Sequence, residues 1–267
     1  MNDAILKQIK QLPPLPETAI KIEAVYQDPN STFDDMVKIL EKDPLLTADI
    51  LKSSNSPLYG FSREITNVAQ AVSLFGMGTI RGFALASIIS KSFALDLSPY
   101  SISNTQYSKH AENQNALVTG WYVRKNPKIL GVLSAAAFLV DIGKVLIAQQ
   151  LIEDKKNDAF NKALSESDDI AQVERDFIEM DTAHVSAQVF DHWRFEEALV
   201  NTIRDSDNPD ASEVSDKLAV KSLHVIRTAV TLNGEITPES TERAKELIAQ
   251  YGLDLESFEK SLANFSE

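Results

Sequence analysis

The longest apolar stretch of the sequence, residues 129–148, constrains the fold more than any other feature. It reads ILGVLSAAAFLVDIGKVLIA and approaches the length of a membrane span, but Asp141 and Lys144 lie well inside it. A charge near the centre of a membrane-spanning helix costs about 2.5–3.5 kcal/mol on insertion scales. A helix that is apolar on all sides, apart from one acid and one base, suits the centre of a large protein core better. We therefore predict a buried central helix over residues 129–150 and no membrane segment.

Helix signals recur along the whole chain. Thr32 can cap a helix, because apolar residues follow it at i, i+3, i+4 and i+7. Near the other end, Thr237-Pro238 gives a cap followed by proline at the first helical position, and Gly252 stands where a C-terminal glycine belongs. Further helical patterns lie at residues 16–27, 45–54, 65–75, 79–95, 104–125, 129–150, 154–166, 169–180, 183–193, 195–205 and 213–232. Since the sequence has no convincing alternating strand or hairpin turn, we predict an all-α fold of about a dozen helices.

Two polar breaks divide the chain. The segment DLSPYSISN at 96–104 is the best candidate for a boundary between two lobes, and RDSDNPDASE at 204–213 precedes a final set of amphipathic helices. Neither break is long enough to be a disordered linker. We therefore predict a multi-helix single body with an N-terminal helical lobe (1–100), a second helical lobe (101–210) and C-terminal helices that pack on the body (211–267).

Charge and cysteine content narrow the possible functions. The 26 Lys and Arg against 39 Asp and Glu give a net charge of −13. Such a field repels nucleic-acid phosphates and anionic membranes, and the longest basic run is the pair Lys155-Lys156. The absence of cysteine excludes disulfides, thiolate catalysis, iron–sulfur clusters and zinc ribbons, and it suits a reducing cytoplasm. We expect a cytoplasmic protein with no nucleic-acid partner.

Four groups of residues follow one another in an order that suggests a family. They are LPPLP at 12–16, KDPLLT at 42–47 leading into NSPLYG at 55–60, the helical run from Ile65 to Arg81, and AFLVDIGK at 137–144. Together they resemble the HDOD family, the HD-related output domain of bacterial signalling proteins, over roughly residues 10–205. The resemblance implies that the second lobe is HD-like, and it leaves the tail from about residue 210 outside the family pattern.

The resemblance also carries a metal site over to this sequence. Catalytic HD proteins hold a divalent metal with a first histidine, an adjacent His-Asp pair and a later Asp, and the metal activates water for phosphoester hydrolysis. His110 matches the first histidine, and Val140-Asp141 occupies the pair. His184 matches a further histidine, and Asp205 falls where relatives show a final His or Asp. Since valine has no lone pair to offer, the resemblance implies a degenerate core with no catalytic residue and no bound metal.

Asp141 needs partners, because an ionised carboxylate among apolar neighbours is costly. Lys144 at i+3 is one partner, and His110 is another if the helices pack as in the family. We hypothesise that these three residues form a buried polar cluster that replaces the metal site, with a weakly bound metal as the alternative. Glu174 and Asp181, by contrast, are interpreted as solvated residues at helix starts.

Three classes of function follow from these observations. The first is a non-catalytic signal-transduction module of the HDOD type, which needs no cofactor and acts through a protein partner or a small ligand. Its input is expected from a separate protein, and its oligomeric state is left open. The alternative is a metal-dependent phosphohydrolase acting on a nucleotide or cyclic dinucleotide, with His110, Asp141 and His184 as surviving ligands. A nucleic-acid-associated regulator is disfavoured by the net charge.

Overall fold

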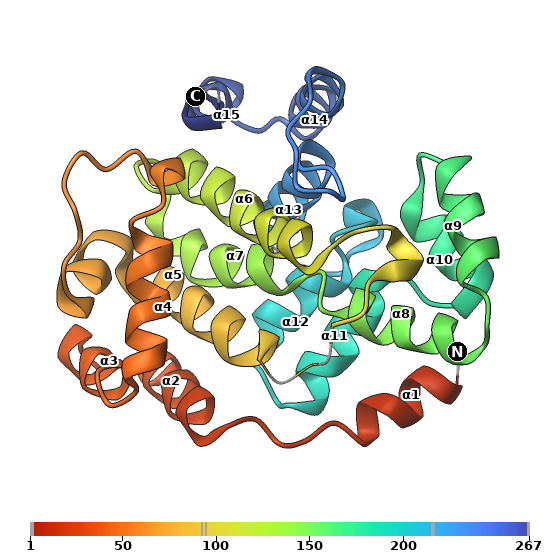
Figure 1. The fold of residues 1–267 in the computed structure, drawn as a ribbon. Helices are drawn as coiled ribbons and strands as arrows, with labels where there is room; N and C mark the ends of the chain where they lie inside the picture. Colours follow the sequence, from red (N-terminus) through yellow and green to blue (C-terminus); the bar gives the residue numbers. More distant parts are fainter. Residues whose placement is uncertain (1–2, 92, 94, 215–216, 266–267) are drawn as a thin grey trace.

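The computed structural model describes residues 3–91, 93, 95–214 and 217–265 of the chain. In these residues the regular structure is helical throughout, without a strand, which confirms the predicted all-α fold (Figure 1). The α-helices, in chain order, are α1 (Asp3–Lys10), α2 (Glu17–Gln27), α3 (Phe33–Leu40), α4 (Pro44–Ser54), α5 (Val68–Ser90), α6 (Asn104–Tyr122), α7 (Pro127–Leu139), α8 (Gly143–Glu153), α9 (Asn157–Ser165), α10 (Ile170–Ile178), α11 (Thr182–His192), α12 (Glu197–Arg204), α13 (Leu218–Ala229), α14 (Pro238–Tyr251) and α15 (Leu255–Leu262). Short 3-10 turns lie at Pro57–Tyr59, Ser98–Tyr100, Pro209–Ala211 and Ala263–Phe265.

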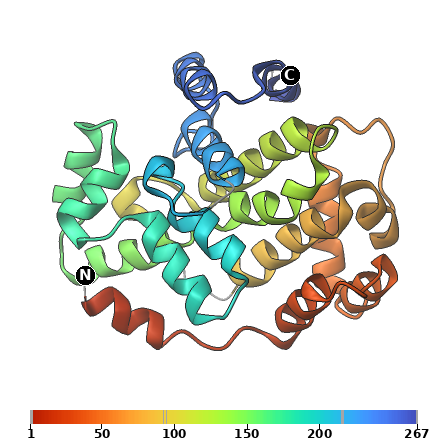
Figure 2. The same cartoon turned by 180° about the vertical axis from the view of Figure 1, so that it is seen from behind.

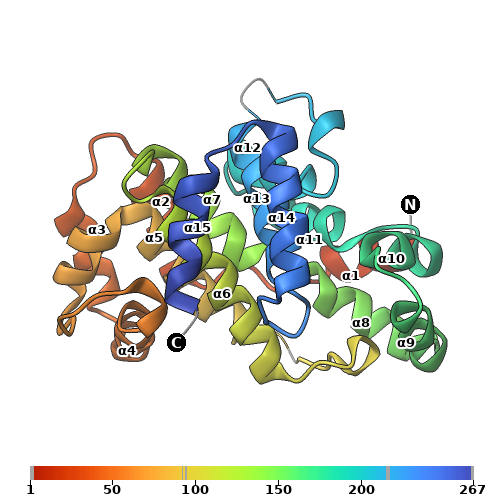
Figure 3. The same ribbon diagram turned by 90° about the horizontal axis from the view of Figure 1, so that it is seen from above.

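Helix α7 lies at the centre of the helical body. It packs against α5, α6, α12 and α13, and α5 in turn carries α2, α3 and α4 (Figure 1). Helices α8 to α11 form the opposite end, where α1 also packs, joined to α2 by the extended segment 11–16 (Figure 2). Seen from above, α15 lies over α6 and α14 lies over α13 (Figure 3). The C-terminal helices therefore pack on the body, while the lobe boundaries near residues 100 and 210 stay predictions.

The single helix predicted over residues 129–150 is wrong, because the structure has two helices there. Helix α7 ends and α8 begins on either side of a tight turn that contains Asp141. Ser186 of α11 serves both helix ends: its Oγ accepts from the Gly143 amide at 2.8 Å and donates to the Val140 carbonyl at 2.6 Å. A segment that is apolar on all sides has no amphipathic phase that would mark such a break.

Two smaller differences concern the N-terminal helices. Helix α1 is absent from the sequence prediction, and the helices predicted at 65–75 and 79–95 belong to the single element α5. Gly76, with φ of 77° and ψ of 163°, interrupts the helical backbone inside α5. The predicted break is therefore a kink at a residue whose positive φ favours glycine.

Two apolar stretches, Val68–Ser90 and Lys128–Glu153, have the length and hydropathy of membrane spans. Within their most apolar windows, 56% and 89% of the residues are buried inside the protein. Both stretches supply the central packing layer of α5, α7 and α8, where burial on all sides is expected.

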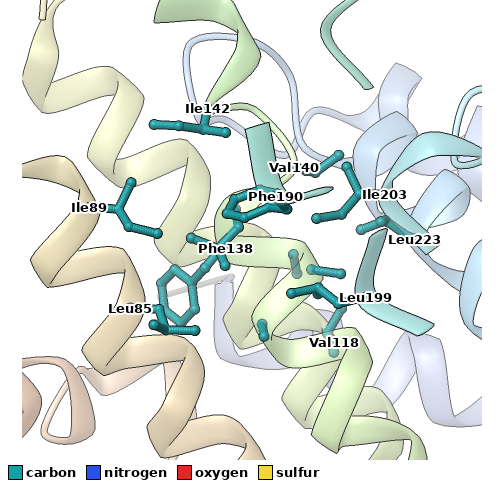
Figure 4. Close-up of a cluster of buried hydrophobic side chains, with 14 of the residues drawn as sticks. Leu85, Ile89, Val118, Phe138, Val140, Ile142, Phe190, Leu199, Ile203 and Leu223 are labelled. Carbon is teal, nitrogen blue, oxygen red and sulfur yellow. The ribbon is translucent and has the colours of Figure 1, made fainter. Parts of the chain in front are cut away.

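The apolar core is continuous from the N-terminal helices to α15. Figure 4 shows the part of it where α7, α11, α12 and α13 meet, with Val140 close to Ile203 and Leu223. Leu223 belongs to the C-terminal tail, yet it is fully buried. The tail therefore completes the core beneath the turn between α7 and α8.

A buried arginine connects the two ends of the body. Arg81 of α5 is fully buried, and its guanidinium binds Glu23 of α2 at 2.6 and 2.9 Å and Glu196, next to α12, at 2.5 Å. Its Cζ atom also lies 4.1 Å from the centroid of the Tyr26 ring. A buried guanidinium is costly without such partners, and the two glutamates supply them.

Candidate functional site

Asp141 lies at the centre of a buried polar cluster and is only 4% exposed. Its Oδ2 accepts from Nε2 of His110 at 2.9 Å and from Nε2 of Gln114 at 3.0 Å, both on α6. Its Oδ1 lies 3.3 Å from Nζ of Lys144 in the first turn of α8. The structure therefore brings together His110, Asp141 and Lys144, the three residues of the hypothesised cluster.

Lys144 connects Asp141 to a second buried acid. Its Nζ lies 3.2 Å from Oε1 of Glu174 and 3.1 Å from Oγ1 of Thr182. Glu174 also accepts from the Thr182 amide at 2.6 Å and from the Tyr100 hydroxyl at 2.9 Å. The interpretation of Glu174 as a solvated residue is wrong: its side chain is 1% exposed, because α10 turns it inward to meet the lysine.

Arg227 of α13 brings a further positive charge to Asp141. Its Nη2 lies 3.8 Å from Oδ1 of Asp141, while Nη1 donates to Asp207 and, at 3.0 Å, to Oγ of Ser206. Sequence analysis missed this residue. The sequence signal that could have found it is its spacing: Arg227 follows Leu223 by four residues, which places its charge on the buried face of the helix.

The charges of the cluster keep Asp141 and Lys144 ionised. Burial acts to raise the pKa of Asp141, but the charges of Lys144, His110 and Arg227 hold that pKa well below its usual value. Burial acts in the opposite sense on Lys144, yet Glu174 and Asp141 raise its pKa above the ordinary value. At neutral pH the turn between α7 and α8 therefore holds a carboxylate bound by fixed cations.

A cleft of about 790 Å³ opens over this cluster. Its lining includes His110, Asp141 and Lys144 together with residues of α9, α10, α13 and α14. His184 and Asp205 are not among the described residues that line it. The aspartate from the loop after α12 that reaches the cleft is Asp207.

His184 and Asp205 are held by other partners. Asp181 caps α11 and accepts from the His184 amide at 2.9 Å and from its Nδ1 at 2.7 Å. Asp205 binds Nε of the neighbouring Arg204 at 2.8 Å. The interpretation of Asp181 as solvated is also wrong, because it is 1% exposed and receives Nη1 of Arg175 at 2.8 Å. The structure thus leaves His184 and Asp205 outside the cluster at Asp141.

The residues at this site do not fit a divalent metal. Val140 offers no donor atom, and its side chain lies in the apolar core (Figure 4). The carboxylate of Asp141 already receives His110, Gln114 and Lys144, and the positive charges around it oppose the approach of another cation. In the part of the chain that the structure describes, no group of three or more His, Cys, Asp or Glu side chains is placed to hold an ion.

Comparisons with known proteins agree on the family and the fold. The model of the HDOD domain matches residues 12–209. An uncharacterized protein of Treponema pallidum (strain Nichols) is 24% identical over 254 residues, which cover 90% of this chain and 46% of that protein. The chain therefore spans about half the length of this relative.

Solved structures cover the tail as well as the matched region. A protein from Shewanella amazonensis SB2B, named as a phosphohydrolase, has a TM-score of 0.71 at 21% identity, with 99% of this chain and 95% of that chain covered. A protein from Marinobacter aquaeolei VT8, named as a signal transduction protein, has a TM-score of 0.64 at 20% identity, with 99% and 65% covered. At these identities the likeness shows a shared fold, and function has to be argued from the site.

Removal of the Asp141 carboxylate tests the buried cluster. We expect Asp141→Ala to lower the free energy of unfolding by about 3–5 kcal/mol, because it leaves buried cations without their counter-charge. Asp191→Ala, at an exposed position on α11, is the control and should change it by less than about 0.5 kcal/mol. Denaturant unfolding measures both. A chelator should leave the melting temperature of the unaltered protein unchanged, and a drop would contradict a cluster held without metal.

The cap of α11 predicts a specific acid sensitivity. The bonds from His184 outweigh burial and lower the pKa of Asp181 from 3.8 to about 2. Because the folded value lies below the unfolded one, the ionised carboxylate stabilises the fold above about pH 4, and this contribution is lost as the pH falls toward 2. The stability difference between the unaltered protein and Asp181→Asn should therefore shrink by about 2 kcal/mol over that interval. Denaturant unfolding at several pH values measures it, and a pH-independent difference would refute the assignment.

Proposed function

We propose, from the premise that the chain belongs to the HDOD domain family, that it is a non-catalytic regulatory module of bacterial signal transduction. The observation that carries the proposal is the state of Asp141, the acid that matches the HD pair. Its oxygens are bound by His110, Gln114 and Lys144 instead of being free to hold a metal. The name of the Marinobacter neighbour supports a signalling role.

The module acts, in this proposal, by binding a protein partner in the cytoplasm. Contiguous apolar side chains on a surface are typical of protein contact sites, and in this proposal the exposed apolar residues of α2 to α5 form such a site. Helices α2 to α5 adjoin and carry several such residues. These are Ile20, Phe33, Leu45 and Leu74, which are 53%, 51%, 73% and 49% exposed. The net charge of −13 directs the choice of partner away from nucleic acid.

The competing function is a metal-dependent phosphohydrolase acting on a nucleotide or cyclic dinucleotide. The name of the Shewanella neighbour favours it, since the two chains share their fold over almost their whole length. It would require His110 and Asp141 to exchange their present partners for a metal ion. It would also have to work with Val140 in place of a ligand.

A hydrolysis assay separates the two functions. We expect the purified protein to carry no stoichiometric metal and to hydrolyse a generic phosphodiester with added Mn²⁺ no faster than Asp141→Asn, because Asp141 is bound by side-chain donors. Metal analysis and product release measure this. Bound manganese, iron or zinc together with turnover that disappears in Asp141→Asn would establish the phosphohydrolase instead.

Affinity capture tests the binding role. The protein, immobilised and exposed to extract of its native cell, should retain a specific partner, and Leu45→Glu should lose it because a charge enters the exposed apolar surface. Leu255→Glu is the matched control: Leu255 is 40% exposed on α15, which packs on α6 at the opposite side of the body from α2 and α3 (Figure 1), and this variant should capture normally. Equal capture by both variants would remove α2 to α5 as the contact surface.

A further inference from the structure

We propose that the cluster around Asp141 is a guanidinium-binding site whose built-in ligand is Arg227 of the C-terminal segment. The guanidinium spans two acids from different parts of the chain, with Nη2 3.8 Å from Asp141 and Nη1 bound to Asp207. Ser206 accepts from the same Nη1 at 3.0 Å. The side chain is 13% exposed, so these contacts are largely shielded from water.

The charges of the site explain why it needs a second positively charged side chain besides Lys144. Asp141, Glu174 and Asp207 place three carboxylates around the floor of the cleft. Lys144 reaches the first two but has no contact with Asp207 among the described pairs. Arg227 supplies that contact, and its pKa is raised above the ordinary value because the neighbouring acids outweigh burial. The planar fork of a guanidinium suits two separated carboxylates better than a single ammonium does.

The chain holds Arg227 in place from both directions. Before it, the buried Leu223 anchors α13 in the core (Figure 4). After it, the Thr231 carbonyl accepts from Nδ1 of His110 at 2.8 Å, and the Gly234 carbonyl accepts from Nδ2 of Asn113 at 2.7 Å. Gly234 has φ of 82°, and a Cβ there would lie 2.9 Å from the His110 amide nitrogen. Only glycine allows the loop to lie this close to α6.

The site still has an unused acceptor. Oδ2 of Asp207, a residue that lines the cleft, is buried and has no hydrogen-bond partner among the described residues. A guanidinium carries five N–H donors on an arginine, so it suits a site rich in buried carboxylate oxygens. The chemistry of the site thus favours a guanidinium over the divalent ion that the family pattern implies.

Chemical rescue tests this inference and does not depend on the proposed function. We expect Arg227→Ala to lower the melting temperature by roughly 6–20 °C, as for the loss of one partner of a buried pair. Guanidinium or methylguanidinium at millimolar, non-denaturing concentration should then raise the melting temperature of this variant, by binding the vacated site. The same additive should not raise that of the unaltered protein.

Arg243→Ala is the matched control for the rescue. Arg243 also lines the cleft but is exposed on α14, and its removal should cause neither loss nor rescue. Absence of rescue in folded Arg227→Ala, equal rescue of Arg243→Ala, or rescue by Mn²⁺ would each overturn the inference. If Arg227→Ala does not fold, Arg227→Lys serves instead: it keeps a charge without the fork and should melt below the unaltered protein. A full wild-type melting temperature in Arg227→Lys would overturn the requirement for a guanidinium.

Discussion

The burial of one carboxylate, that of Asp141, sets the arrangement of the second half of the chain. It lies 4% exposed in the turn between two apolar helices, where an unpaired charge would be too costly to keep. Its partners come from three directions: His110 from α6, Lys144 from α8 and Arg227 from α13. Because each partner must reach the same two oxygens, the compensation of this charge fixes how those helices converge.

A buried charge of opposite sign does the same for the first half. Arg81 of α5 binds Glu23 of α2 and Glu196 at the start of α12, so it connects the N-terminal helices to α12. Replacing such networks by apolar residues is often neutral or stabilising, so their contribution to net stability is small. A packing of these apolar helices that left either charge without its partners would bear the cost of an unpaired buried charge.

The sequence predicts the fold and part of the site for physical reasons that differ between residues. Capping and spacing predict most of the helices, and the cost of burial predicts that Asp141 needs counter-charges. Two partners of Asp141 are predicted correctly: Lys144 from its i+3 spacing on the sequence, and His110 from the family resemblance. Arg227 and Glu174 are missed, because the inward turn of a charge on an amphipathic helix depends on which distant helix it meets. The break before α8 is missed because a segment that is apolar on all sides has no alternation of apolar and polar positions whose interruption would mark it.

In the proposed function, side-chain cations stand where catalytic HD proteins hold a metal ion, and this changes the chemistry available at Asp141. A divalent metal is a Lewis acid with open coordination positions, and it lowers the pKa of a bound water so that the water can attack a phosphoester. An ammonium and a guanidinium neutralise the same carboxylates but have no open coordination position and cannot generate a bound hydroxide. Lys144 and Arg227 are moreover tied to α8 and α13, so they cannot dissociate as a metal can. In the proposed function, the cluster around Asp141 performs no catalysis and instead holds the C-terminal segment against the body. The cleft above it is large enough to admit a ligand.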